Sequence, residues 1–237
     1  MPVYHYLPFL LILIAIIIIS VKTEKLTLAG ALTGGLIALL IFIGAGYAGI
    51  SMLAAFFVLG TAATIWKKNE KQRFKSTTDH TKRNSGQVLA NGGVAAITGI
   101  LAWYIPAQAE LLRIMMAASL TSAMADTLSS ELGMIYGRRF YNIATFKKDE
   151  RGLDGVISLE GTLIGLAGSI IIAIIYAIGF GWNNAFFIIL IAGTIGNLSD
   201  SFLGALLERK KYLNNDSVNF LNTLIAALAA ALWGVLG

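Results

Sequence analysis

The stretch ADTLSSELGMIYGRRFYNIATFKKDERGLDGVISLEGTLIGLAG, from Ala125 to Gly168, begins inside one apolar segment and ends inside the next. Three acidic residues, Asp126, Glu131 and Glu160, lie in or near these segments, and a basic loop separates the two segments. A carboxylate at the centre of a membrane-spanning helix costs about 3 kcal/mol, so it is rarely present without a function. Acidic groups facing a basic loop favour binding of a phosphorylated substrate together with a divalent cation.

The composition is typical of a polytopic membrane protein. Of the 237 residues, 57% are hydrophobic and 13% are charged, about half the charged fraction of a soluble domain. The mean hydropathy is +0.74. The net charge of +5 lies in loops, so it indicates membrane topology rather than a nucleic-acid partner. The absence of cysteine excludes disulfides and thiolate metal sites.

Eight apolar segments approach the roughly 20 residues that a membrane-spanning helix needs. We therefore expect an all-α polytopic membrane protein with a single transmembrane domain over residues 1–237. The expected spans are 3–21, 27–45, 48–66, 87–105, 111–136, 156–181, 185–207 and 217–236. The first lacks a basic n-region and a cleavage site, so we expect it to be retained. The expected cytoplasmic loops are 67–86, 137–155 and 208–216.

The basic residues predict the orientation of these spans. With eight spans, all of the 18 Lys and Arg residues except Arg113 fall on one side of the membrane. Basic residues are in excess in cytoplasmic loops, so we expect this side to be cytoplasmic and both termini to lie outside. A prokaryotic cell membrane is the expected location. The stretch 67–84 is expected to be a linker that contacts anionic lipid headgroups.

Three spans after residue 84 start alike. The segments 84–92, 153–161 and 215–223 each follow a basic loop, and each carries one polar residue at the same position, Asn91, Glu160 or Asn222. This predicts repeated helix hairpins in the C-terminal two thirds of the chain. The free N–H groups at these helix starts favour anions. Alternatively, Asp154 and Asp216 simply cap the helices.

The spans 111–136 and 185–207 also align without gaps. Asp126 then matches Asn197, and Ser129 matches Asp200 one helical turn nearer the cytoplasm. Asp126 and Asp200 are therefore the preferred metal-linked acids, since Mg²⁺ needs only one or two carboxylates beside phosphate oxygens and water. Glu131 follows, although it lies about 140° around the helix from Asp126.

Three motifs resemble the transmembrane protein 19 family of integral membrane proteins. They are QVLANGG at 87–93, ADTLSSELG at 125–133 and RGLDGVISLEGTLIG at 151–165. The resemblance runs from about residue 30 to the C-terminus, and Leu153 departs from a small polar residue in the family pattern. The family includes the phytyl-phosphate kinases of vitamin E synthesis. The resemblance therefore implies phosphoryl transfer from a nucleoside triphosphate, CTP in the best-known branch, to an isoprenyl monophosphate of the phytyl or geranylgeranyl type.

The resemblance and the residues together imply the following roles. The expected catalytic residues are Asp126, Glu131, Glu160 and Asp200, of which Asp126, Glu131 and Asp200 would hold Mg²⁺. The expected substrate- and phosphate-binding residues are Asn91, Arg138, Arg139, Lys147, Lys148, Arg151, Asp154, Ser158, Asn197 and Asn222. The expected partners are a lipid phosphate, a nucleotide and membrane lipid, without nucleic acid. The oligomeric state, including a homo-oligomer, stays open.

Two other functions stay open at this point. A transporter or flippase of a phosphorylated lipid would use the intramembrane acids as ion sites, but it would need polar residues toward the outer face, where the expected spans have few. A nucleotidyltransferase that forms a CDP-lipid would use the same metal and phosphate groups. The basic residues Lys147 and Lys148 could also serve topology alone.

Overall fold

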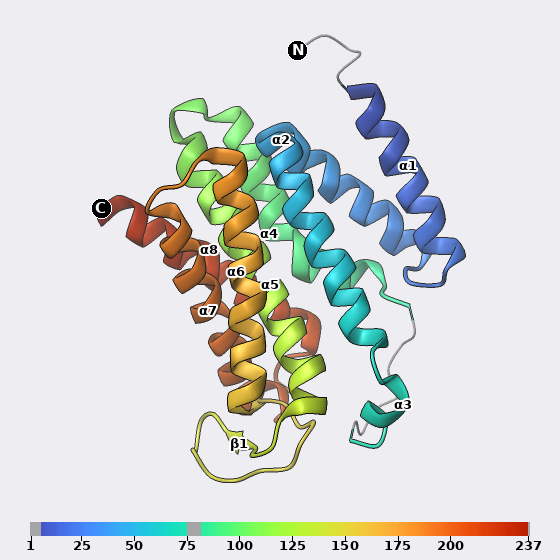
Figure 1. The fold of residues 1–237 in the computed structure, drawn as a ribbon, viewed down its shortest axis with the longest axis vertical. Helices are drawn as coiled ribbons and strands as arrows, with labels where there is room; N and C mark the ends of the chain where they lie inside the picture. The colour runs from blue at the N-terminus through green and yellow to red at the C-terminus, as the bar shows by residue number, and fades with distance from the viewer. Residues whose placement is uncertain (1–5, 75–81, 237) are drawn as a thin grey trace.

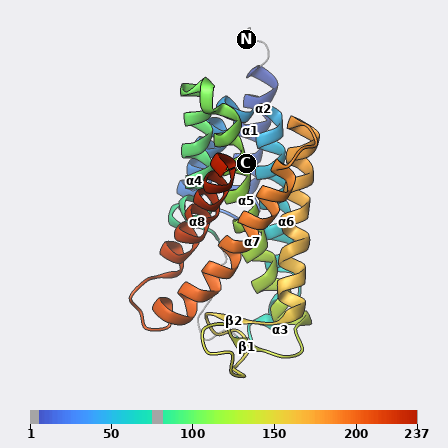
Figure 2. The same ribbon diagram turned by 90° about the vertical axis from the view of Figure 1, so that its left-hand side faces the viewer.

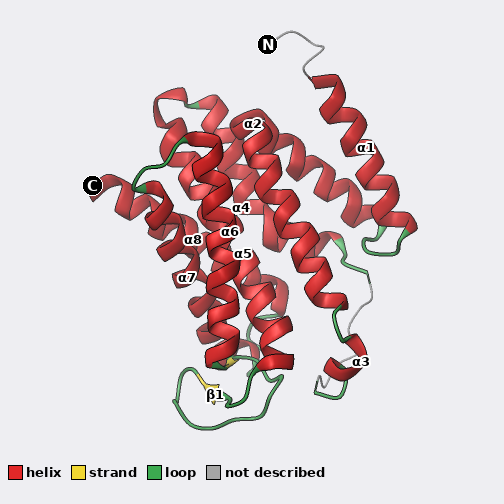
Figure 3. Cartoon of the chain, viewed as in Figure 1, coloured by secondary structure: helices red, strands yellow, loops and turns green. Residues whose placement is uncertain are grey.

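The computed structural model describes residues 6–74 and 82–236, and most of this part of the chain is helical (Figures 1 and 3). The helices are α1 (Tyr6–Lys22), α2 (Leu28–Ile65), α3 (Lys68–Lys71), α4 (Ser85–Tyr104), α5 (Ala109–Tyr136), α6 (Leu159–Phe180), α7 (Ala185–Leu203) and α8 (Asn215–Leu236). The short 3₁₀ turn η2 (Pro106–Gln108) precedes α5, and the π-helical turn η3 (Gly204–Glu208) extends α7. The strands β1 (Tyr141–Asn142) and β2 (Val156–Ile157) pair antiparallel. The predicted all-α membrane class is confirmed.

The predicted number of eight spans is wrong. Within the described residues, six helices are long and apolar enough to cross a membrane. The expected spans 27–45 and 48–66 both lie in α2, and the first expected span corresponds to α1, which is shorter than the other six.

Gly46 explains why α2 contains two expected spans. Its φ of 59° and ψ of −148° interrupt the helix and divide α2 into two limbs. Both limbs run down from the bend beside the α2 label in Figure 1. A residue with a Cβ rarely adopts this backbone conformation, whereas glycine does so readily. The chain therefore bends within a hydrogen-bonded helical element, without the connecting loop that separates the other helices.

Helix α5 forms the centre of the molecule. It packs against α2, α4, α6, α7 and α8. The residues from 116 to 125 are all buried, and most of them are small. A helix that is covered on all sides and rich in small residues allows close backbone approach, which is the usual packing chemistry between membrane helices. At Gly133 a Cβ would lie 2.8 Å from the Cα of Gly161, so α5 and α6 touch through their backbones.

The basic loops gather at one end of the molecule, which we call the basic end. The loop after α1 contacts the start of α4, where Lys82 Nζ lies 2.8 Å from Glu24 Oε1. The guanidinium of Arg151 lies 4.2 Å from the ring centroid of Phe74, which joins the loop after α5 to the segment after α3. Figure 2 shows α3, β1 and β2 together at the lower end of the molecule.

The opposite end is formed by the short links. Arg113, the basic residue predicted to lie alone on this side, donates from Nε to the carbonyl of Gly44 over 2.8 Å and lies 5.3 Å from the Phe180 ring centroid. The separation of basic loops from short links therefore agrees with the charge pattern. Which end faces the cytoplasm stays a prediction.

The starts of α4, α6 and α8 differ from the predicted repeat. The capping side chains are Asn84, Ser158 and Asn214, which accept hydrogen bonds of 3.0, 3.1 and 2.8 Å from backbone N–H groups of the first turn. Asp154 and Asp216 therefore do not provide these caps. Glu160 is the second residue of α6, whereas Asn91 and Asn222 lie in the second turn or deeper. The prediction of equal depth is wrong for Glu160, because β2 pairs with β1 and delays the start of α6.

Candidate functional site

The acidic residues of α5 and α7 meet inside the bundle. The carboxyl groups of Asp126 and Asp200 are joined by a side-chain hydrogen bond, and both residues are partly exposed. Two carboxyl groups close enough to form a hydrogen bond need either a shared proton or a cation between them. We call Asp126 and Asp200 the acidic pair.

Asn222 of α8 orients one member of the acidic pair. Its Nδ2 donates to Asp200 Oδ2 over 2.6 Å, and its Oδ1 accepts from Ser122 Oγ over 3.0 Å. Asn222 is fully buried, so both ends of its amide are fixed by these bonds. A fully satisfied buried network of this kind holds a side chain in one orientation. Asn222 and Ser122 thus position Asp200.

A second polar contact joins α5 and α7 beside the acidic pair. Ser129 Oγ donates to Asn197 Oδ1 over 3.2 Å, and Asn197 is buried. The Nδ2 of Asn197 lies 2.9 Å from where a Cβ on Gly165 would stand, so the missing side chain at Gly165 makes room for the amide. Asn197 therefore belongs to the packing around the acidic pair.

Glu131 has a different environment. Its carboxylate is ion-paired with Lys71, and Lys71 is buried. The Nζ of Lys71 also donates to the carbonyl oxygens of Ala63 and Thr64, each over 2.8 Å, and so caps the end of α2. The charge of Glu131 acts on Asp126, but its ion pair ties it to α3 rather than to the acidic pair.

The three predicted metal ligands, Asp126, Glu131 and Asp200, are therefore not gathered into one metal site. In residues 6–74 and 82–236, no three His, Cys, Asp or Glu side chains are placed to hold a metal ion together. The acidic pair alone offers two neighbouring carboxyl groups. An oxygen-only donor set of this size suits Mg²⁺, which takes one or two protein carboxylates and completes its shell with substrate oxygens and water.

Two further acids act on the acidic pair through space. The charge of Glu208 acts on Asp126, and the charge of Asp154 acts on both Asp200 and Glu208. Glu208 ends the π-helical turn, in which Arg209 N donates to Gly204 O over 3.1 Å. Such turns change the helix face that later residues occupy and are frequent at functional sites. No pattern in the sequence announces a π turn, so sequence analysis missed Glu208.

Arg209 is a second residue that sequence analysis missed. Its Nη1 lies 2.8 Å from Asp149 Oδ2 in the loop after α5. Among the described residues, Nε and Nη2 of Arg209 are buried and have no hydrogen-bond partner. Buried guanidinium N–H groups without partners are costly, and a phosphate offers the matching pair of acceptors. The backbone N–H of Glu150 lowers the pKa of Asp149, and Arg209 and Asn142 lower it further.

The predicted phosphate-binding loop has two kinds of basic residue. The side chains of Arg138, Arg139, Lys147 and Lys148 are exposed at the basic end. Arg151 instead lies between the rings of Phe74 and Phe140, 4.2 and 5.0 Å from their centroids. The four exposed side chains carry positive charge at the surface of the basic end, whereas Arg151 is held by the aromatic rings.

The other predicted residues line the helix starts. Glu160 accepts a 3.3 Å hydrogen bond from Arg138 N, and Ser158 caps α6, so both join the loop to the helix. Asn91 donates to the carbonyl of Gln87 over 3.0 Å, and its buried Oδ1 has no partner in the described part of the chain. None of these three contacts the acidic pair through a hydrogen bond that the structure shows.

Arg83, just before α4, is another residue that sequence analysis missed. Its Nη2 lies 3.5 Å from Thr64 Oγ1. A Cβ on Gly60 would lie 3.7 Å from this Nη2 and 3.4 Å from the methyl group of Thr127. The guanidinium therefore reaches the contact between α2 and α5, one residue along α5 from Asp126.

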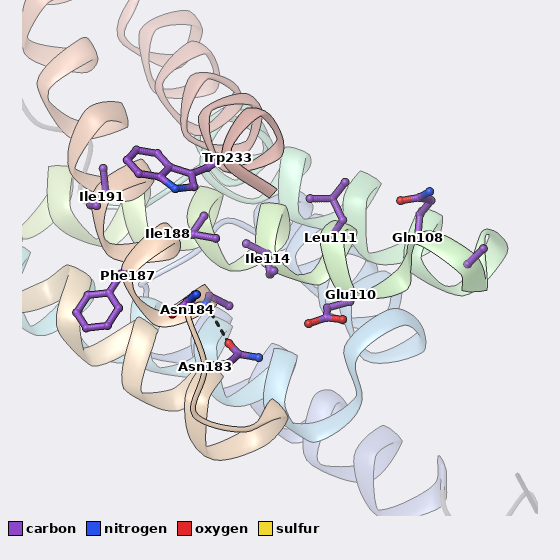
Figure 4. A pocket seen from close by; sticks show the side chains of 12 residues that line it. Gln108, Glu110, Leu111, Ile114, Asn183, Asn184, Phe187, Ile188, Ile191 and Trp233 are labelled. Atoms are coloured by element: carbon purple, nitrogen blue, oxygen red, sulfur yellow. Dashed lines mark hydrogen bonds between the residues drawn. The ribbon is translucent and has the colours of Figure 1, made fainter. Parts of the chain in front are cut away.

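A pocket of about 630 Å³ lies at the end opposite the basic loops (Figure 4). Glu110, Leu111 and Ile114 line it from α5, and Trp233 lines it from α8. Figure 4 also shows the hydrogen bond in which Ala185 N donates to Asn183 Oδ1 over 2.9 Å. None of the predicted site residues lines this pocket.

Comparison with known proteins identifies relatives along nearly the whole chain. The chain is 31% identical over 223 residues to Uncharacterized membrane protein MJ0933 of Methanocaldococcus jannaschii, covering 94% of this chain and 92% of that protein. It is 34% identical over 196 residues to Protein VTE6, chloroplastic, of Arabidopsis thaliana, covering 79% of this chain but 59% of the plant protein. A Synechocystis membrane protein is 29% identical over 199 residues, covering 81% and 76% of the two chains.

No solved structure matches the chain. The family model described as Integral membrane protein DUF92 matches residues 11–227. This match spans most of the sequence and contains the three motifs and the acidic pair. The chain is therefore a multi-pass integral membrane protein of the DUF92 family, the transmembrane protein 19-like family that its motifs indicate.

Proposed function

We propose that the protein is a membrane-embedded kinase that transfers a phosphoryl group from a nucleoside triphosphate, with CTP as the first candidate, to an isoprenyl monophosphate. The product is the isoprenyl diphosphate. The observation that carries this proposal is the hydrogen-bonded acidic pair, Asp126 and Asp200, oriented by Asn222. The family and the relative VTE6 support a membrane kinase of this class.

The acidic pair fits a role in binding a divalent cation. Asp126 and Asp200 would hold Mg²⁺, and phosphate oxygens would complete its coordination. When bound, the cation neutralises charge on the β- and γ-phosphates. Asn222 keeps Asp200 in place for this role through its 2.6 Å hydrogen bond.

The basic end suits the nucleotide. The exposed Arg138, Arg139, Lys147 and Lys148 neutralise polyphosphate charge, and Arg209 offers two guanidinium nitrogens without partners among the described residues. The acceptor is already an anion, so it attacks the γ-phosphorus without a general base. One P–O bond forms to the acceptor, the bond to the β-phosphate oxygen breaks, and the nucleoside diphosphate leaves. Positioning and charge neutralisation supply most of the catalysis in such reactions.

The direct test uses the purified full chain in detergent with Mg²⁺, geranylgeranyl or phytyl monophosphate, and each nucleoside triphosphate in turn. We expect a lipid diphosphate on thin-layer separation. Asp126→Asn should lower turnover by on the order of 100-fold or more, because it removes one carboxylate from the charge-stabilising site. Glu110→Gln is the matched control, since Glu110 lies on the same helix at the opposite end.

Other products would overturn the proposal. A CDP-lipid would identify a nucleotidyltransferase that uses the same acidic pair. Uptake of lipid phosphate into vesicles without turnover would identify a transporter. Equal activity of wild type and Asp126→Asn would remove the acidic pair from the mechanism.

A further inference from the structure

We infer that the isoprenyl chain of the substrate binds in an apolar groove between α1, the two limbs of α2 and α4, with its phosphate at Arg83. This inference rests on the proposed function, because it places the acceptor of that reaction. The groove has a volume of about 300 Å³. Its lining is apolar over most of its length and includes Leu13, Ile17, Leu53 and Phe57.

Small residues keep this groove open. Gly34 on the first limb of α2 and Ala54 on the second both line it. A Cβ on Gly34 would stand in ordinary van der Waals contact with a methyl group of Val88, 3.7 Å away, so a longer side chain there would have to extend past Val88. The groove is therefore built from positions where larger side chains would fill it.

The two ends of the groove differ in chemistry. At one end Phe9 stacks on Phe42 with ring centroids 4.0 Å apart, and both residues are buried. Toward the basic end the lining becomes polar at Ser20, Arg83, Gln87 and Asn91. The distance from Phe9 to Ser20 along α1 is about 16 Å. A groove with one apolar end and one cationic end matches a single apolar chain with an anionic head.

The polar end carries groups that suit a phosphate. A guanidinium binds phosphate through paired N–H donors, and Arg83 is the only cationic residue that lines the groove as described. The buried Oδ1 of Asn91 has no partner among residues 6–74 and 82–236, and a water bound to the phosphate can donate to it. The polar end therefore offers both a cation and an unsatisfied acceptor.

The same end leads toward the acidic pair. Arg83 Nη2 and the methyl group of Thr127 both lie next to Gly60, and Phe56 beside them lines the groove. Thr127 is adjacent to Asp126 in α5. A phosphate held by Arg83 is thus near the contact of α2 with the segment that carries the acidic pair.

The groove can be tested by photolabelling, independently of turnover. A geranylgeranyl monophosphate with a diazirine at the tail end is bound to the full chain in phosphatidylcholine nanodiscs, irradiated, and mapped by mass spectrometry. We expect labels near Phe9 and Phe42, competed by unmodified geranylgeranyl monophosphate. Arg83→Gln should weaken binding of the monophosphate by about tenfold and leave binding of geranylgeraniol unchanged, because only the phosphate contact is lost.

Matched variants test the apolar wall. Gly34→Leu should fill the groove and reduce labelling by about tenfold, and Ala54→Leu provides a second filling at an exposed position of the groove wall. Ala62→Leu is the control, because Ala62 is exposed on the same limb of α2 and does not line the groove. Size-exclusion profiles check that each variant is folded.

The outcomes separate this inference from the proposed function. Labels in the groove without kinase turnover would keep the lipid site and overturn the kinase. Turnover with labels elsewhere, or unchanged binding in Ala54→Leu and Arg83→Gln, would keep the kinase and overturn the groove. Labelling in the groove that unmodified geranylgeranyl monophosphate does not compete would identify a site for ordinary membrane lipid and also overturn the groove.

Discussion

Ser129 on α5 donates a 3.2 Å hydrogen bond to Asn197 on α7, beside the hydrogen bond between Asp126 and Asp200. The alignment of the two helices matches Asp126 with Asn197 and Ser129 with Asp200. If α5 and α7 are exchanged according to this alignment, the contact between Ser129 and Asn197 becomes the contact between Asp200 and Asp126. Such a symmetric relation is typical of an interface between two similar helices. Each of the two helices thus contributes one acid to the acidic pair.

Asn222→Ala should impair activity more than stability. The change removes the donor to Asp200 and leaves Ser122 Oγ without its side-chain acceptor. We expect turnover to fall on the order of tenfold to 100-fold and the unfolding free energy to fall by about 1–3 kcal/mol. Steady-state turnover and thermal unfolding in detergent measure the two effects.

Thr223→Ala is the control for this change. Thr223 is also buried on α8, but its hydroxyl donates to the backbone carbonyls of Ala90 and Phe220. The Thr223→Ala variant should be less stable than wild type but should retain the turnover of wild type per folded molecule. Equal turnover in Asn222→Ala and Thr223→Ala would show that Asn222 does not position the acidic pair.

Arg209→Lys should raise the KM for the nucleotide while leaving the KM for the lipid phosphate near that of wild type. Lysine keeps the positive charge but lacks the planar pair of N–H donors with which a guanidinium binds two phosphate oxygens at once. We expect about a tenfold effect, measured by varying each substrate at saturating concentrations of the other. Lys210→Arg serves as the neighbouring control, because Lys210 is exposed. An unchanged nucleotide KM would assign Arg209 to the ion pair with Asp149 alone.

Lys71→Met should destabilise the protein by about 3–5 kcal/mol, because it breaks a partly buried ion pair with Glu131 and removes the donor to the carbonyls at the end of α2. The double variant Lys71→Met with Glu131→Gln should recover part of this loss. Thermal unfolding of the two single variants and the double variant gives the coupling energy. Strictly additive effects would contradict a direct interaction between the two side chains.

The loop after α5 should loosen in acid. The pKa of Asp149 is lowered in the folded state by the N–H of Glu150, with Arg209 and Asn142 contributing. A carboxyl group with a lowered pKa stabilises the folded loop above its ordinary pKa and loses this effect as the pH falls through the folded value. Limited proteolysis between about pH 6 and pH 3 should therefore show cleavage of the loop rising toward low pH.

Asp149→Asn provides the comparison for the acid effect. It should make cleavage at pH 6 resemble that of wild type at low pH and should flatten the pH dependence. A wild-type profile that is independent of pH would contradict a role of Asp149 in holding the loop.

Sequence alone could identify the acidic pair but not the details around it. Alignment of two helices selected Asp126, Asn197 and Asp200, because a duplicated fold repeats its polar positions. The comparison of the three helix starts misplaced Glu160, because the pairing of β1 with β2 delays the start of α6 and a two-residue strand leaves no periodic pattern in the sequence. The expected break between residues 45 and 48 coincides with the bend at Gly46, but the span count is wrong because α2 continues across this bend without a connecting loop.

The missed residues share a different cause. Lys71, Arg83 and Arg209 all lie in segments whose basic charge predicts topology. In the sequence, a basic residue that only sets the orientation of the spans cannot be distinguished from one that makes a tertiary contact. Their roles follow only from tertiary placement: Lys71 caps α2, Arg83 reaches Gly60, and Arg209 pairs with Asp149. Glu208 required the π turn as well.

The backbone contact between the loop after α1 and the start of α4 has a consequence for biosynthesis. Arg83 N donates to Lys25 O, and Thr27 N donates to Arg83 O, each over 3.0 Å. The loop after the first helix therefore cannot reach its final arrangement until residue 83 has left the ribosome. During synthesis these two hydrogen bonds can therefore form only after both limbs of α2 have been made.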